Sequence, residues 1–191
     1  MIKKKIFNNL ITITLILYVF ILILAIMLKT FMVEDLYESY AFLSTFTLKE
    51  RFIRGIKILE FYKIEYELGI IKRTIILDLL NGIVFVPFGM LITHFIKKHR
   101  VLKTVLICLF TSLIIELFQL ITIIGSFMLN DLITNILGGL IGSILYILIT
   151  KNKKYNVYNV LLSLFLVLEI ALFTYLFINL IVNIDAYKMF L

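Results

Sequence analysis

Residues 111–146 read TSLIIELFQLITIIGSFMLNDLITNILGGLIGSILY, which is two long apolar segments joined by a short turn. Four polar side chains interrupt these segments, and they are Glu116, Gln119, Asp131 and Asn135. An ionisable or amide side chain inside a membrane span is costly unless it is paired or faces water. Residues beside this turn are therefore the first candidates for a functional site.

The composition is that of an integral membrane protein. Of the 191 residues, 62% are hydrophobic and 16% are charged, which is more apolar than a soluble domain of this length. The chain has a single cysteine, Cys108, so an intrachain disulfide and a CxxC site are excluded. We also expect no metal and no cofactor. The net charge of +7 comes from basic clusters beside apolar segments. This is a pattern of membrane topology, so we expect no nucleic-acid partner.

Five apolar runs are each long enough to cross about 30 Å of hydrocarbon as a helix. The sequence therefore predicts an all-α polytopic membrane protein with five transmembrane helices. The expected spans are residues 6–28, 74–95, 102–124, 129–149 and 158–182. The first run exceeds the hydrophobic region of a signal peptide and no A-x-A-like site follows it, so we expect an uncleaved span.

Four parts follow from these spans. We expect a first transmembrane helix over 1–28, an extracytoplasmic amphipathic segment over 29–73, a three-helix core over 74–149, and a basic loop with the fifth helix over 150–191. Within the second part, apolar residues recur every three to four positions from Lys49 to Leu68. This period predicts an amphipathic helix on the membrane surface or capping the bundle.

The short basic loops predict the orientation. With five spans, the basic residues near 3–5, 97–103 and 151–154 fall on one side of the membrane, and the turn at Gly125 falls on the other. By the positive-inside rule, the basic side is cytoplasmic. We therefore expect a multi-pass plasma-membrane protein with a cytoplasmic N-terminus and an extracytoplasmic C-terminus.

This orientation brings polar residues of three spans to one depth. In each span two polar residues are three or four positions apart, which places both on one face of a helix. All of these residues fall one to two turns from the outer end of their span, so we expect an outward-facing polar pocket. The expected pocket residues are Asp78, Asn81, Glu116, Gln119, Asp131 and Asn135.

A proline and several glycines predict how these helices bend and pack. Pro87, which is followed by Phe88 and Gly89, predicts a kink near Phe85. On the fourth span, small residues spaced four apart predict a close approach of a neighbouring helix. These packing residues are Gly138, Gly139 and Gly142.

The three core spans together resemble a known family. The motifs are Asn81-x-x-x-Phe85-x-Pro87-Phe88-Gly89, Ser112-x-x-x-Glu116-x-x-Gln119 and Asp131-x-x-x-Asn135-x-x-Gly138-Gly139-x-x-Gly142. In this order and spacing, over about residues 75–148, the chain is similar to the VanZ-like family of bacterial membrane proteins. The family pattern has an arginine and another aspartate shortly before the aspartate matched by Asp131, whereas this chain has GSFMLN at 125–130.

That difference concerns anion binding. An arginine would offer a bidentate partner for a carboxylate or phosphate. Arg73, Lys72 or a basic residue of the Lys49–Lys63 helix is the possible substitute in this chain. Without a substitute, a protonated carboxylate is expected instead of an anion site.

The resemblance implies a protein of the bacterial cell envelope, and the family's namesake is associated with low-level resistance to the lipoglycopeptide teicoplanin. Our first hypothesis is an outward pocket that engages a membrane lipid, a lipid-linked precursor or a lipid-tailed antibiotic. A second is a lipid-modifying enzyme with Glu116 or Asp131 as general base, although no nucleophile pair or metal cluster accompanies them. A third is a structural or assembly subunit, for which the same carboxylates are buttresses.

Overall fold

The computed structural model of the chain describes residues 9–22, 44–57, 63, 66, 71–123 and 127–151. All regular elements in these ranges are helical. They are a helix over Asn9–Leu22, α3 (Leu48–Ile56), α5 (Ile71–Phe95), α6 (Arg100–Thr122) and α7 (Leu129–Lys151). The chain divides into two compact units, Met1–Leu36 with Ile149–Leu191, and Tyr37–Leu148. The second unit contains every residue of the expected pocket.

Among the described residues, three helices are long and apolar enough to cross a membrane, over Asp78–Phe95, Arg100–Thr122 and Leu129–Lys151. They correspond to the second, third and fourth predicted spans, whose helices are thereby confirmed. The described part of the first predicted span is a shorter apolar helix, Asn9–Leu22. The fifth predicted span, 158–182, lies outside the described residues.

Apolar side chains cover the outside of α5, α6 and α7. Ile83 is 62% exposed, Ile114 67% and Leu148 57%, whereas much of the buried surface is polar. This is the reverse of a soluble protein, in which exposed positions are mainly polar. The pattern matches a helix bundle whose exterior faces lipid and whose polar groups face one another.

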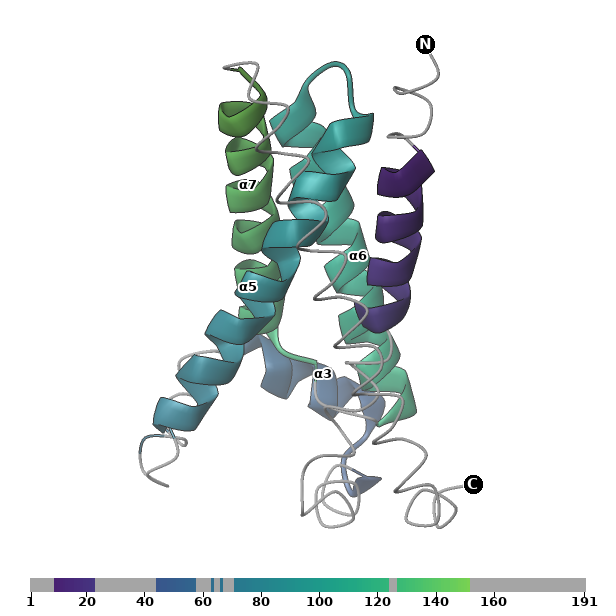
Figure 1. Cartoon of the computed structure of the whole chain (residues 1–191). Helices are drawn as coiled ribbons and strands as arrows, with labels where there is room; N and C mark the ends of the chain where they lie inside the picture. Colours follow the sequence, from purple (N-terminus) through teal and green to yellow (C-terminus); the bar gives the residue numbers. More distant parts are fainter. Residues whose placement is uncertain are drawn as a thin grey trace, which may run out of the picture. The chain divides into compact units, whose positions relative to one another are not determined.

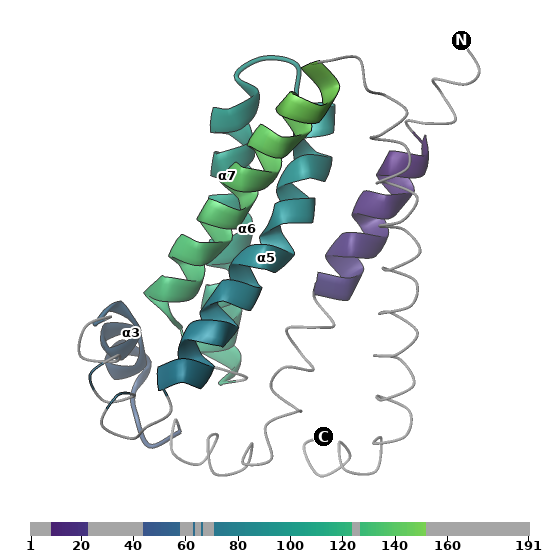
Figure 2. The same cartoon turned by 60° about the vertical axis from the view of Figure 1, so that its left-hand side comes forward.

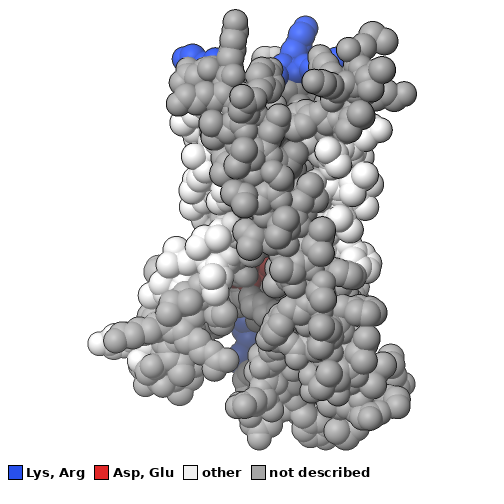
Figure 3. Space-filling model, viewed as in Figure 1, with Lys and Arg blue, Asp and Glu red and all other residues white. Residues whose placement is uncertain are grey.

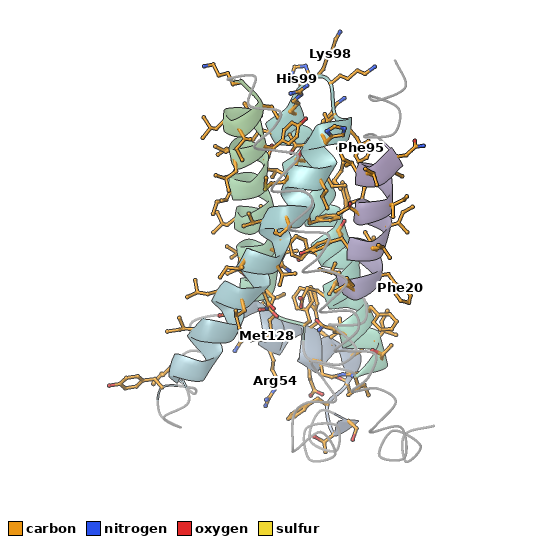
Figure 4. The ribbon with its side chains drawn as sticks, viewed as in Figure 1. Phe20, Arg54, Phe95, Lys98, His99 and Met128 are labelled. Carbon is orange, nitrogen blue, oxygen red and sulfur yellow. The ribbon has the colours of Figure 1, made fainter. Side chains whose placement is uncertain are left out.

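α5, α6 and α7 lie side by side, and α3 lies across one end of this three-helix core (Figures 1 and 2). The loop from α5 to α6 is at the opposite end. Basic side chains gather at that loop end in Figure 3, and the coloured parts of both flanks below them are white. Figure 4 shows the same polarity, with Lys98 and His99 at the loop end and Met128 at the α3 end.

Glycines let the backbones of α5 and α7 approach closely. A Cβ added at Gly138 would overlap the Gly82 carbonyl oxygen, and one added at Gly142 would overlap the Val86 carbonyl oxygen. Gly89 faces the backbone of Gly139 in the same way. Small residues are what such an approach requires. α5 continues as one helix through Pro87, and a kink near Phe85 stays a prediction.

Hydrogen bonds join the helices at the loop end. The hydroxyls of Thr93 on α5 and Thr104 on α6 are 2.9 Å apart and both side chains are fully buried. The hydroxyl of Tyr146 on α7 lies 3.2 Å from Nδ1 of His94 on α5. These hydrogen bonds tie α5 to α6 and α5 to α7 at this end of the core.

The amphipathic helix of the second unit is shorter than predicted. α3 begins with a capping box, in which the Thr47 hydroxyl accepts from the Glu50 amide and the Glu50 carboxylate accepts from the Thr47 amide at 2.8 Å. It ends at Ile56, because the Lys57 amide donates back to the Arg54 carbonyl oxygen at 3.2 Å and the Lys57 backbone leaves helical geometry. The prediction of one continuous helix from Lys49 to Leu68 is therefore wrong at Lys57.

α3 packs on the turn that joins α6 to α7. The rings of Phe52 and Phe127 are 5.0 Å apart between centroids. Gly55 is buried against Phe127, where a Cβ would overlap the Phe127 carbonyl oxygen. The helix is thus a cap on this end of the core, which is one of the two placements predicted for it.

The glycine contact between α5 and α7 generates a first prediction. We expect Gly138→Ala to lower the stability of the purified protein by about 1–3 kcal/mol, because the added methyl group overlaps backbone that cannot rotate away. The measurement is thermal unfolding in detergent, followed by reaction of the buried Cys108 thiol with a fluorogenic maleimide. Leu137→Ala, at a position that is 50% exposed on the same helix, is the matched control, and equal midpoints for the two variants would contradict the packing.

The capping box generates a second prediction. The backbone amide of Thr47, and then its hydroxyl, hold the pKa of Glu50 below its usual value. A lowered folded pKa means that the cap stabilises α3 fully above the unfolded pKa and is lost as the pH falls through the folded pKa. Glu50→Gln is therefore expected to speed amide hydrogen exchange in α3 relative to wild type at pH 7, and a ratio that stays unchanged down to pH 3 would refute this.

Candidate functional site

Two contacts determine which residues of the three core helices lie at the same level. The Asn135 amide on α7 donates to the Ser112 hydroxyl on α6 at 2.9 Å. On the other side, the position of a Cβ at Gly82 on α5 is 3.0 Å from the Thr134 carbonyl oxygen on α7. Ser112, Gly82 and the Thr134–Asn135 pair therefore lie at one level across the core.

Three carboxylates lie one helical turn from that level, all toward the α6–α7 turn. Glu116 follows Ser112 by one turn on α6, Asp131 precedes Asn135 by one turn on α7, and Asp78 precedes Gly82 by one turn on α5. Their exposed fractions are 1%, 8% and 8% in that order. Acidic groups from three helices thus share one level near the end of the core that α3 covers.

Glu116 holds the start of α7. Its Oε2 accepts from the backbone amide of Met128 at 2.8 Å. Met128 precedes the first residue of α7, and its carbonyl accepts from the Leu132 amide at 3.3 Å, so it is the N-cap residue of this helix. A carboxylate at a helix N-terminus is favoured by the helix dipole as well as by the hydrogen bond.

Several buried polar atoms near this end have no hydrogen-bond partner within the part of the chain that the structure describes. Buried polar groups are nearly always satisfied in folded proteins, and leaving one unsatisfied costs about 1–3 kcal/mol. These atoms therefore point to water or to a ligand. They are Gln119 Oε1, Asn130 Nδ2 and Asn135 Oδ1, and a further one, Ser143 Oγ, lies two turns deeper along α7.

The structure places all six expected pocket residues in the three core helices. Five of them are buried, and Asn81 is half-buried. The two contacts above place Glu116, Asp131 and Asn135 near the level of Asp78 and Gly82 on α5. A ligand-binding or catalytic role for these residues stays a prediction.

The sequence interpretation left two residues, Ser112 and Asn130, out of the expected pocket. Ser112 was part of a motif but not of the expected pocket, although its spacing of four from Glu116 places both on one face. Asn130 lies beside Asp131 but breaks the three-to-four residue spacing that was used as the criterion. Arg51 was covered only as one of the basic residues of the Lys49–Lys63 helix, because periodicity does not reveal which of them faces the core.

A metal is not held by side chains that the structure describes. In those ranges, no group of three or more His, Cys, Asp or Glu side chains is arranged to hold a metal ion. The three carboxylates are thus not grouped as ligands of one ion. Their neighbours are amides, hydroxyls and backbone N–H groups, which suit hydrogen bonding to a polar ligand.

Comparisons with known proteins agree with this architecture. The model of the family described as VanZ/LLP1 matches residues 6–150. The chain is also 40% identical over 76 residues to Protein VanZ of Enterococcus faecium, a match that covers 40% of this chain and 46% of that protein. The aligned part is therefore less than half of that relative. No solved structure matches the chain.

The Glu116–Met128 hydrogen bond generates a third prediction. Glu116→Ala removes the acceptor and leaves the Met128 amide unpaired, so we expect a loss of about 1–3 kcal/mol in stability. Glu116→Gln keeps a carbonyl acceptor at the same position and is expected to lose clearly less. Thermal unfolding in detergent measures both variants, and a Gln variant as unstable as the Ala variant would show that charge, not the cap, is what matters.

Proposed function

The chain belongs to the VanZ/LLP1 family, and we propose that it acts in the bacterial cell envelope by engaging the headgroup of an amphiphile at the α6–α7 end of its core. The observation that supports this most is the set of unsatisfied polar atoms buried inside a bundle with an apolar exterior. A ligand with a polar head and an apolar tail suits both environments.

The position of these atoms favours a membrane-embedded ligand over a soluble one. Gln119 lies in the last turn of α6, and Ile121 beside it is 67% exposed. A tail lying along such an apolar flank gains free energy from staying in the hydrocarbon, while the head reaches the amides. Lipids, lipid-linked envelope precursors and lipid-tailed antibiotics all have this form.

Sidedness gives the proposed function its direction. The basic loop between α5 and α6 and the proposed site lie at opposite ends of the core (Figure 4). With the basic loop in the cytoplasm, the site opens toward the outer leaflet. A protein that binds amphiphiles there changes the access of a teicoplanin-like antibiotic to its lipid-linked target. The cell then becomes less susceptible to the drug.

The Met128 hydrogen bond argues against Glu116 as a general base. Its Oε2 accepts from the backbone amide that starts α7, so a capping role accounts for this carboxylate without catalysis. No nucleophile pair accompanies it among the described residues. We therefore propose binding without turnover.

A fourth prediction tests the site through Gln119. Gln119→Leu keeps the side-chain volume but removes the unsatisfied carbonyl, so we expect about tenfold weaker binding of a fluorescent teicoplanin analogue to protein in nanodiscs. Teicoplanin susceptibility of cells that express the variant is expected to rise to that of cells without the protein.

Ser143→Ala is the matched control, because it also removes an unsatisfied buried oxygen but lies deeper along α7. It is expected to bind and protect like wild type. If both variants are expressed at the wild-type level and neither changes binding or susceptibility, the proposed function is wrong. If both lower the amount of folded protein and nothing else, the polar residues are purely structural.

A further inference from the structure

Arg51 is a basic residue on the face of α3 that meets the core. It lies one turn before Gly55, which is packed against the Phe127 carbonyl, and residues four apart share a helix face. Phe127 leads directly into Met128 and the start of α7. The guanidinium of Arg51 is thus carried on the side of α3 that covers the end of the core.

Two of the three guanidinium nitrogens of Arg51, Nε and Nη1, are inaccessible and make no hydrogen bond within the described residues, while the residue as a whole is half-buried. The other arginine of α3 differs, since the Arg54 guanidinium lies 3.9 Å from the centre of the Phe46 ring and points away from Met128 (Figure 4). Burying a positive charge without a counter-charge is costly, so Arg51 calls for an anionic partner.

The first turn of α7 supplies donors at the same end. Asn130 is only 6% exposed and its Nδ2 has no partner among the described residues. The positive end of the α7 dipole lies there as well, and the Met128 amide donates to Glu116. Two negative groups, Glu116 and Asp131, are close by, and a cation is needed before a further anion can enter.

We propose that Arg51 and the first turn of α7 bind the phosphate oxyanion of a lipid headgroup. The inference rests on the proposed function and specifies its ligand class. Each of the two unpartnered nitrogens, Nε and Nη1, offers an N–H donor to a phosphate oxygen, and Asn130 Nδ2 adds a further donor. The lipid is anchored in the bilayer by its tails, which concentrates the phosphate at this end of the core.

The test uses the full chain in a neutral detergent with three probes, which are phosphatidylglycerol, a diacyl glycolipid without phosphate, and inorganic phosphate. Binding is measured as the rise in thermal midpoint from Cys108 labelling, and as retained lipid in native mass spectrometry. We expect phosphatidylglycerol to bind best, and Arg51→Gln to weaken that binding by about tenfold or more. Arg54→Gln removes the same charge from the same helix and is expected to leave it unchanged.

Arg51→Lys keeps the positive charge but loses the planar guanidinium and its N–H donors. It is the second variant in case Arg51→Gln does not fold. We expect it to fold and to bind phosphatidylglycerol more weakly than wild type. Equal binding of phosphatidylglycerol by wild type and both Arg51 variants overturns the inference. If inorganic phosphate raises the thermal midpoint and phosphatidylglycerol does not, the inference is also wrong, because the bound phosphate is then not that of a lipid. If the phosphate-free glycolipid binds as well as phosphatidylglycerol, the phosphate requirement is wrong and the proposed function stands. If neither lipid binds, both the inference and the proposed function are wrong.

Discussion

The hydrogen bond from the Met128 amide to the Glu116 carboxylate joins the end of α6 to the start of α7. An apolar helix bundle offers little water to satisfy either group, so each group stabilises the other there. The bond also fixes the rotation of the first turn of α7, which carries Asn130 and Asp131. Everything proposed for the site depends on that rotation.

A second constraint is the close approach of α5 and α7 at Gly82, Gly138 and Gly142. Because backbone meets backbone there, little side-chain volume separates the helices, and the register between them has few alternatives. The polar groups of three helices come to one level as a consequence. α3 then covers this end, and it carries Arg51 one turn before Gly55, which packs against Phe127.

The core helices were predictable because an apolar run of sufficient length has few other folds in a membrane. α6 and α7 begin and end within two residues of their predicted bounds. The end of α3 was not predictable, since the apolar period continues past Lys57 while the backbone turns there. The partners of Glu116 and Asn135 were not predictable either, because spacing assigns a residue to a helix face and not to a partner on another helix. The shared depth of the acidic residues could be argued from topology, but the cap at Met128 and the placement of Arg51 arise only from tertiary packing.

Accessibility of the Gln119 position from outside the cell tests the site most directly. In a Cys108→Ala background, Gln119→Cys is treated in intact cells with a membrane-impermeant thiol reagent, with and without a lipid-tailed glycopeptide. Labelling from the outside that slows when the glycopeptide is present is the expected result. Ile107→Cys, on the flank of the same helix, is expected to stay unlabelled. If Gln119→Cys reacts only after the membrane is dissolved, or reacts equally with and without the glycopeptide, these residues form no outward site for an amphiphile.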